Sequence, residues 1–314
     1  MRYPKVSVII PAYNEEDVIE DCLKSVTSLD YPKKKLEIIL IDDGSTDKTV
    51  EKAKKFKIKI IKGPHKGVGV ARNLGIKKSK GELILFVDAD QRVERKLLKK
   101  MLPVILNPFV VGLDPQERVM NKNKFWAKMH FLRSNLGTYQ YDFAFLRLFK
   151  KKIIKEIGII NPKYGYYDDW EFTYRAYKKY NKKGQIIRYR NAIVYHKYPE
   201  NIGQMWRQNK WAGKSIIYLF PDYPLETLRK LIFPFLCWLP IVSMSLFFGS
   251  GIFKKLGIIL LIPFLLMEIY RSFRMYKITK YPESFFTPIF DIITMLMYLV
   301  GMGMGIWEKG YPKV

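Results

Sequence analysis

Two short apolar runs in the first third of the chain each end in aspartates, and this pattern constrains the fold more than any other feature. The first, residues 37–41, is followed by two adjacent aspartates, and the second, residues 82–87, is followed by Asp88 and Asp90. Apolar runs of this length are typical of strands. In an open parallel sheet, ligands bind beyond the carboxyl ends of the strands, and two carboxylates one residue apart can share a divalent cation. The pattern therefore predicts a cation and a phosphate-bearing ligand at one edge of a sheet.

Strand and helix patterns alternate around these runs. We expect strands at residues 6–10, 36–41, 58–62 and 83–87, and helices at residues 18–29, 46–56 and 69–79. This βαβ repetition predicts an α/β fold with a parallel, doubly wound sheet. A dinucleotide-binding fold is the main competitor, but the first expected strand is followed by Pro11-Ala12-Tyr13-Asn14-Glu15 and not by a G-x-G-x-x-G turn.

Charge narrows the possible partners. The 314 residues include 55 Lys and Arg against 29 Asp and Glu, a formal net charge of +26, which favours polyanionic partners. The lysines are dispersed in short groups, which is typical of solvated faces, so we expect no nucleic acid partner. Cys22 and Cys237 are the only cysteines, so no disulfide framework is available and a reducing compartment is favoured.

Four motifs in fixed order resemble those of the nucleotide-sugar-dependent glycosyltransferases of family 2. They are Val6-Ser-Val-Ile-Ile-Pro-Ala-Tyr-Asn14-Glu15, Asp42-Asp43-Gly-Ser-Thr-Asp47, Gly69-Val-Ala-Arg72-Asn73-Leu-Gly75 and Asp88-Ala89-Asp90. The resemblance covers residues 1–215 and implies a GT-A fold, which is a Rossmann-like, mostly parallel sheet flanked by helices. It also implies a metal-dependent hexosyltransferase that uses a nucleotide-sugar donor.

The resemblance assigns roles to the donor-side motifs. It implies that Pro11, Tyr13 and Glu15 line the nucleotide pocket, that Asp42 and Asp43 hold the base and ribose edge, and that Arg72 and Ala89 belong to the same nucleotide-sugar site. Asp88 and Asp90 are similar to the family's DxD pair, which bridges Mg²⁺ or Mn²⁺ to the donor diphosphate. A cation there would stabilise the negative charge that develops on the departing nucleoside diphosphate. The alternative for either acidic cluster is a turn with a helix cap.

On the acceptor side, the segment Tyr166–Phe172 is similar to the family's acidic acceptor motif. Asp169 falls where the family keeps its catalytic base, and an inverting transfer needs such a carboxylate near the acceptor hydroxyl. Helix capping by Asp168 or Asp169 is the alternative. The resemblance also implies His196 as a further metal ligand, although a lone histidine at a strand end is more often structural.

The segment Gln204–Trp211 resembles the Gln-x-x-Arg-Trp element of processive members without matching it. Arg207, Lys210 and Trp211 could close over the diphosphate, with cations pairing to phosphate and indole stacking on sugar. The alternative is an amphipathic interfacial helix that leads into a membrane.

Two acceptor classes remain open for such an enzyme. We favour a hydroxyl of a glycolipid or another lipid-linked, membrane-associated acceptor, met near residues 107–141, because a phosphate acceptor needs no base and the Asp168-Asp169 pair is present. The alternative is a polyprenyl (dolichyl) phosphate glycosyl synthase. A non-catalytic membrane scaffold is the third hypothesis, from a different class.

Three apolar stretches near the C-terminus predict a membrane domain: Leu231–Gly249, Leu256–Met267 and Phe285–Trp307. A buried helical core is the alternative, because Glu268 and Asp291 are costly in lipid. Basic residues before and between these stretches, Arg271 among them, predict cytoplasmic loops in contact with membrane lipids. We therefore expect a multi-pass protein of the cell membrane. Its parts are a cytoplasmic catalytic domain (1–215), an interfacial linker (216–230) and a membrane domain with about three hydrophobic helices (231–314).

Overall fold

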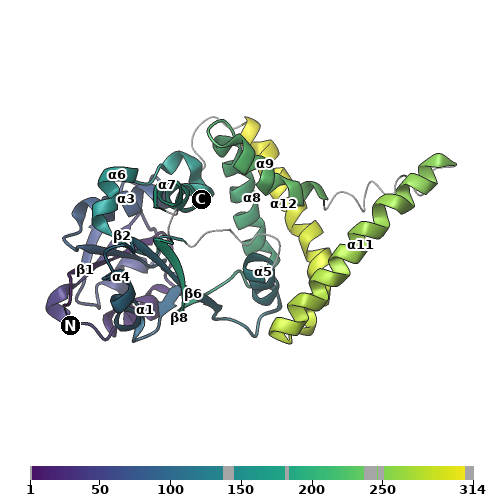
Figure 1. Cartoon of the computed structure of the whole chain (residues 1–314). Helices are drawn as coiled ribbons and strands as arrows, with labels where there is room; N and C mark the ends of the chain where they lie inside the picture. Colours follow the sequence, from purple (N-terminus) through teal and green to yellow (C-terminus); the bar gives the residue numbers. More distant parts are fainter. Residues whose placement is uncertain (1, 137–144, 181–183, 237–245, 247–250, 308–314) are drawn as a thin grey trace. The chain divides into compact units, whose positions relative to one another are not determined.

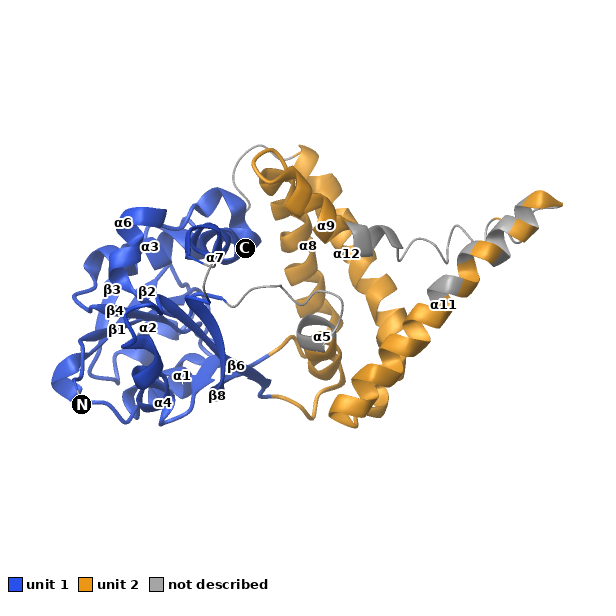
Figure 2. Cartoon of the chain, in the orientation of Figure 1, with its two compact units in different colours: residues 1–120, 141–197, 313 blue, residues 121–140, 198–312, 314 orange. Residues whose placement is uncertain are grey.

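The computed structural model describes residues 2–136, 145–180, 184–236, 246 and 251–307. The chain divides into two compact units, shown in different colours in Figure 2. The first comprises residues 1–120, 141–197 and 313, and the second comprises residues 121–140, 198–312 and 314. The predicted domain boundaries at residues 215 and 230 stay predictions.

The first unit is built on one eight-stranded sheet with the order β3-β2-β1-β4-β7-β6-β8-β5. Its strands are β1 (Val6–Ala12), β2 (Leu36–Asp42), β3 (Lys59–Lys62), β4 (Leu83–Phe86), β5 (Gln91–Val93), β6 (Gly112–Val119), β7 (Leu148–Lys150) and β8 (Ile186–His196). The pairs β2–β3, β1–β2 and β1–β4 are parallel, which confirms the four predicted strands and their direction. Beyond β4 the sheet is mixed, because β7 is antiparallel to both β4 and β6 and β5 is antiparallel to β8.

Helices cover both faces of this sheet, as Figure 1 shows. They are α1 (Ile19–Thr27), α2 (Thr49–Ala53), α3 (Val68–Lys78), α4 (Leu97–Ile105), α6 (Ile154–Ile157) and α7 (Asp168–Tyr180), with 3₁₀ turns η1 (Lys33–Lys35), η2 (Lys151–Ile153) and η3 (Pro162–Tyr167). Side chains alternate between the two faces of a strand. Val8 of β1 therefore packs in the cluster that contains α1 and α4, and Ile9 packs in the cluster with α3 and α7. The predicted helix at residues 46–56 is shorter than expected.

The parallel strands end together at one edge of the sheet. In the β1–β2 pair Ala12 lies opposite Asp42, and in the β1–β4 pair Ile9 lies opposite Phe86, which directly precedes the second acidic cluster. Helix α3 packs closely on β1 below this edge. A Cβ atom on Gly75 would lie 2.3 Å from Ile9 Cγ2, so glycine is needed at this contact.

The second unit is helical. It contains α5 (Phe125–Leu136), α8 (Ile202–Leu219), α9 (Pro224–Leu236), α11 (Ile252–Thr279), the 3₁₀ turn η5 (Pro282–Phe286) and α12 (Thr287–Trp307). Helix α8 packs along α12 through glycines. A Cβ atom on Gly213 would lie 1.9 Å from the Tyr298 carbonyl oxygen, and one on Gly301 would lie 2.1 Å from the Lys210 carbonyl oxygen. The two backbones are therefore in direct contact.

One helix among the described residues is long and apolar enough to cross a membrane, the segment Pro282–Trp307. This supports one of the three predicted membrane helices. The predicted stretch Leu231–Gly249 lies largely outside the described residues, and Leu256–Met267 is part of α11, which does not meet the same criterion.

A buried ion cluster joins α11 to α12. Arg271 Nη1 donates to Glu268 Oε1 at 2.8 Å, and Arg271 Nη2 pairs with Asp291. All three side chains are buried. The prediction that Arg271 belongs to a loop is wrong, because Arg271 lies within α11, where its guanidinium pairs with the two acids that had argued against the apolar helices.

Candidate active site

The Asp88-Ala89-Asp90 segment forms a tight turn between β4 and β5, and both ends of the turn are anchored. The Asp88 amide donates to Gln91 Oε1 at 3.1 Å, and the Gln91 amide donates to the Asp88 carbonyl at 2.9 Å. The Lys197 amide, just after β8, donates to the Asp90 carbonyl at 3.1 Å. Ala89 is buried. The backbone therefore holds the two aspartates in defined positions.

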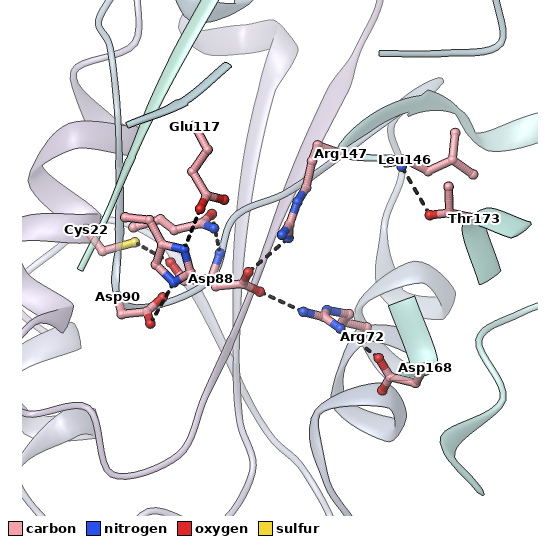
Figure 3. Close-up of polar contacts among 11 residues, drawn as sticks. Cys22, Arg72, Asp88, Asp90, Glu117, Leu146, Arg147, Asp168 and Thr173 are labelled. Carbon is pink, nitrogen blue, oxygen red and sulfur yellow. Dashed lines mark hydrogen bonds and ion pairs between the residues drawn. The ribbon is translucent and has the colours of Figure 1, made fainter. Parts of the chain in front are cut away.

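Asp88 lies between two arginines (Figure 3). Its Oδ1 accepts from Arg72 Nη2 at 2.8 Å, and its Oδ2 accepts from Arg147 Nη1 at 2.9 Å. Burial opposes ionisation of Asp88, but attraction to the Arg147 and Arg72 guanidinium groups is the larger effect and holds the pKa of Asp88 well below its usual range. Arg147 was missed at the sequence level, because it lies 59 residues from Asp88 and belongs to no motif.

The same chain of charges continues to Asp168 in the first turn of α7. Arg72 Nη1 donates to Asp168 Oδ1 at 3.0 Å, and Asp168 is buried. Burial raises the pKa of Asp168, which the Arg72 guanidinium offsets only in part. A Cβ atom on Gly69 would lie 2.4 Å from Asp168 Oδ2, so the glycine of the third motif makes room for this carboxylate.

Asp169 occupies a different environment from its neighbour. It lines a small pocket together with both arginines and a set of mainly apolar side chains: Arg72, Arg147, Phe86, Phe145, Leu146, Ile160, Phe172 and Thr173. The pocket therefore brings one carboxylate and two guanidinium groups to the same hollow.

Asp90 faces a second set of partners. Its Oδ2 lies 3.1 Å from His196 Nε2, and His196 Nδ1 lies 3.0 Å from Glu117 Oε1 on β6. Burial opposes protonation of His196, but Asp90 and Glu117 raise its pKa well above 6.5. Asp90 Oδ1 is buried and has no hydrogen-bond partner among the described residues.

These atoms suit a hard or borderline divalent cation. A carboxylate oxygen with a free lone pair and an imidazole nitrogen are both accepted ligands of Mn²⁺, and carboxylates suit Mg²⁺. Glu117 would fix the proton of His196 on Nδ1 and leave Nε2 to bind a metal. Among the described residues no group of three or more His, Cys, Asp or Glu side chains could hold a metal ion. Oxygens of a ligand or of water would therefore have to complete the site.

The first two motifs meet at the ends of β1 and β2. Asp42 Oδ1 accepts from the Ser45 amide at 3.1 Å, and Asp43 accepts from the amides of Lys66 and Gly67 at 3.2 and 2.7 Å. The ring of His65 lies 4.7 Å from that of Tyr13, and His65 Nδ1 donates to the Asp43 carbonyl at 2.7 Å. Both aspartates are buried and shape the loops, as the turn-and-cap alternative expects.

Glu15 shares the electrostatics of the acidic turn. Burial, together with the negative charges of Asp90 and Asp88, raises its pKa to about 8. Pro11 lies buried within β1. The remaining predicted residues, Arg207, Lys210 and Trp211, lie on α8 in the second unit. Their role at the donor stays a prediction.

A mostly parallel α/β sheet with a DxD turn beyond the ends of its strands is the arrangement that the resemblance to the GT-A glycosyltransferases predicted. Comparison with known families agrees: residues 7–162 match the family model for Glycosyl transferase family 2. Over these residues the chain belongs to glycosyltransferase family 2, which confirms the predicted family and the GT-A catalytic fold.

Curated relatives extend the similarity along the chain. The probable glycosyltransferase YdaM of Bacillus subtilis is 31% identical over 246 residues, which are 69% of this chain and 56% of that protein. The poly-beta-1,6-N-acetyl-D-glucosamine synthase of Staphylococcus epidermidis is 28% identical over 264 residues, 76% of this chain and 62% of that protein. The chain thus spans little more than half the length of these relatives.

Solved structures share the fold. The mannosyltransferase PcManGT from Pyrobaculum calidifontis, in complex with GDP-Man and Mn²⁺, superposes with a TM-score of 0.66 at 18% identity, covering 99% of this chain and 89% of that one. Staphylococcus aureus TarS 1–349 in complex with UDP-GlcNAc gives a TM-score of 0.50 at 18% identity, covering 93% and 90%. At these identities the likeness concerns the fold alone.

Proposed function

We propose that this protein is an inverting glycosyltransferase that moves a sugar from a nucleotide-diphosphate donor to a hydroxyl of a lipid-linked or membrane-associated acceptor. The observation that carries the proposal is the pocket that unites Asp169 with Arg72 and Arg147. A carboxylate can take the acceptor proton, and guanidinium groups can hold the oxygens of a departing diphosphate.

The unequal environments of Asp168 and Asp169 support Asp169 as the base. Asp168 is buried and accepts a hydrogen bond from Arg72 through Oδ1, so we assign it the role of positioning that arginine. Asp169 borders the pocket. In the reaction, the proton of the acceptor hydroxyl goes to Asp169 as the acceptor oxygen bonds to the anomeric carbon. The bond from that carbon to the phosphate oxygen breaks, and the nucleoside diphosphate leaves with the bonding electrons.

Asp90 and His196 are the metal ligands that we propose for Mg²⁺ or Mn²⁺, with Glu117 orienting His196. Asp90 Oδ1, which is buried and has no hydrogen-bond partner in the described part of the chain, supports this choice, and so do the structural relatives that were solved with Mn²⁺. When bound, such a cation neutralises charge on the diphosphate. Both Asp88 oxygens are engaged by arginines, so we propose that Asp88 acts on the donor through Arg72 and Arg147.

The acceptor and the location are parts of the same proposal. TarS was solved with UDP-GlcNAc and PcManGT with GDP-Man, so related folds accept different nucleotides. We propose a lipid-linked acceptor at the cell membrane, a multi-pass anchor and a cytoplasmic catalytic unit. The apolar segment Pro282–Trp307 supports one crossing, and the exposed Arg274, Lys277 and Lys280 favour a cytoplasmic position for the end of α11.

The substitution Asp169→Asn tests this function. We expect it to lower transfer to a hydroxyl acceptor by about 10²–10⁴-fold, the usual contribution of a general base, while thermal stabilisation by donor and Mn²⁺ is retained. The exposed Asp17→Asn is the matched control and should transfer normally. Undiminished transfer to a polyprenyl phosphate by Asp169→Asn would favour the phosphate-acceptor alternative. Retained transfer to the hydroxyl would refute the assignment of the base.

A further inference from the structure

Exposed aromatic side chains gather where α11 turns into α12. They come from the end of α11, from η5 and from the start of α5, and we call them the aromatic corner: Phe125 (41% exposed), Phe273 (58%), Tyr276 (37%), Phe285 (46%) and Phe286 (53%). The rings form two groups. Phe285 lies 5.2 Å from Phe273 and 5.6 Å from Tyr276 between ring centroids, and Phe286, its neighbour in the chain, lies 5.9 Å from Phe125. Clustered exposed apolar surface of this kind marks an interaction site.

Cations surround the aromatic corner. Exposed basic side chains come from the last turns of α11 and from the residues next to α11 and α5: Lys122, Lys124, Arg274, Lys277 and Lys280. Lys280 lies over the Tyr276 ring at 5.9 Å. Glu283 is the one acid in residues 121–128 and 269–290 of the sequence, and it is paired with Lys128 at 2.5 Å. The surface is therefore both aromatic and strongly positive.

We propose that the aromatic corner lies in the headgroup layer of an anionic membrane. Aromatic rings prefer the boundary between hydrocarbon and water, and Lys and Arg next to them pair with anionic lipid phosphates. The apolar segment Pro282–Trp307 starts at this corner, which is where a spanning helix would leave the headgroup layer. A protein partner with an acidic groove would also complement the positive charge, but it would not explain why the aromatic corner continues directly into an apolar helix.

This inference deepens the proposed function, on which it rests for the lipid-linked acceptor. Helix α5 comes from the part of the chain where the sequence predicted the acceptor, and it belongs to the second unit (Figure 2). There Phe125 contacts Phe286, and the Trp126 ring lies 6.0 Å from that of Phe290. The corner would therefore bring the predicted acceptor segment to the depth at which a lipid-linked sugar presents its hydroxyls.

A nitroxide at position 286 tests the depth of the corner in the full chain. Phe286→Cys, in a Cys237→Ser background, is labelled and reconstituted in phosphatidylcholine vesicles with or without phosphatidylglycerol. Ile159→Cys is the matched control, because Ile159 is an exposed apolar residue (52%) of the first unit and lies outside the predicted acceptor segment. We expect the label at 286 to collide with lipid-soluble oxygen several-fold more, relative to a water-soluble nickel chelate, than the label at 159. Equal ratios at the two positions would overturn the proposal.

Charge reversal gives an independent measurement. In vesicles with phosphatidylglycerol, Lys277→Glu with Lys280→Glu should lower the oxygen-to-nickel ratio at position 286 to its value in phosphatidylcholine alone, and the exposed pair Lys34→Glu with Lys35→Glu should leave it unchanged. An unchanged ratio in the first variant would refute the electrostatic part. Dipolar broadening between labels at 286 would identify a second copy of the chain as the occupant and overturn the lipid assignment. Neither measurement needs sugar transfer. A preparation that is inactive but has a lipid-buried label at position 286 would therefore refute the proposed function and leave the membrane position of the aromatic corner standing.

Discussion

The two aspartates of the DxD turn belong to one motif, but replacing each by asparagine should affect a different property of the protein. Asp88 accepts from the guanidinium groups of buried Arg72 and partly buried Arg147, and Asp90 carries a buried oxygen without a partner among the described residues. Asp88→Asn therefore leaves two positive charges under-compensated. Asp90→Asn removes a negative charge from a side chain that is 34% exposed. We expect the first change to act on stability and the second on metal binding.

The magnitude follows from the partners. Removing one member of a buried ion pair costs about 3–5 kcal/mol. Arg72 keeps Asp168 as a partner and the Asp88 side chain is 22% exposed, so we expect the low end, about 3 kcal/mol, for Asp88→Asn. This lowers the Tm of a unit of this size by about 6–12 °C. For Asp90→Asn, His196 keeps Glu117 as a partner and the Asp90 side chain is 34% exposed, so stability should change by no more than about 1 kcal/mol.

Thermal unfolding of the full chain in detergent, with and without Mn²⁺ and a nucleoside diphosphate, measures both effects. The wild type should gain stability from the ligands, Asp90→Asn should lose that gain, and Asp88→Asn should keep part of it from a lower baseline. If Asp90→Asn is as unstable as Asp88→Asn, or if it keeps the full response to Mn²⁺, then the division of roles between the two aspartates is wrong.

Three further predictions concern packing and pH. Gly301→Ala should lower stability by about 1–3 kcal/mol in thermal unfolding, because the added Cβ would meet the α8 backbone. Gly303→Ala is the control, and it should be neutral or stabilising because no atom lies within 4 Å of its Cβ. Equal effects of the two changes would contradict the close packing of α8 and α12. Arg271→Met should cost about 3–5 kcal/mol, because it removes the cation that pairs with two buried acids. The exposed Arg274→Met should stay within about 0.5 kcal/mol, so a mild Arg271→Met would argue against the ion cluster. Burial raises the pKa of Asp114 from 3.8 to about 6, so the folded state binds more protons and stability falls by about 3 kcal/mol as the pH rises from about 4 to 6. Asp114→Asn keeps an acceptor for the Phe145 amide, and it should abolish this fall when the unfolding free energy is measured against pH. If the variant keeps the pH profile of the wild type, ionisation of Asp114 does not destabilise the folded state.

The strongly periodic half of the catalytic sheet was predictable from the sequence. Strands β1 to β4 and helices α1 and α3 lie where apolar runs and helical patterns predicted them, because their apolar side chains pack into the two core clusters. Strand β3 contributes only the partly buried Ile60 and Ile61. Strands β5 and β7 were not predicted. Each has three residues, too few to show a period, and each is stabilised by antiparallel pairing with a strand far along the chain.

The sequence by itself determined the α/β class, the family motifs and the apolar C-terminal segment, because these depend on local pattern and order. Only the tertiary structure decided which partner each acid meets. Asp168 and Asp169 are neighbours of the same type, yet one is buried against Arg72 and the other borders a pocket. Arg147 reaches Asp88 across 59 residues, and Arg271 is buried between two acids. These contacts join segments that are far apart in the sequence. The burial of each charge depends on how those segments pack, and no local sequence pattern records that packing.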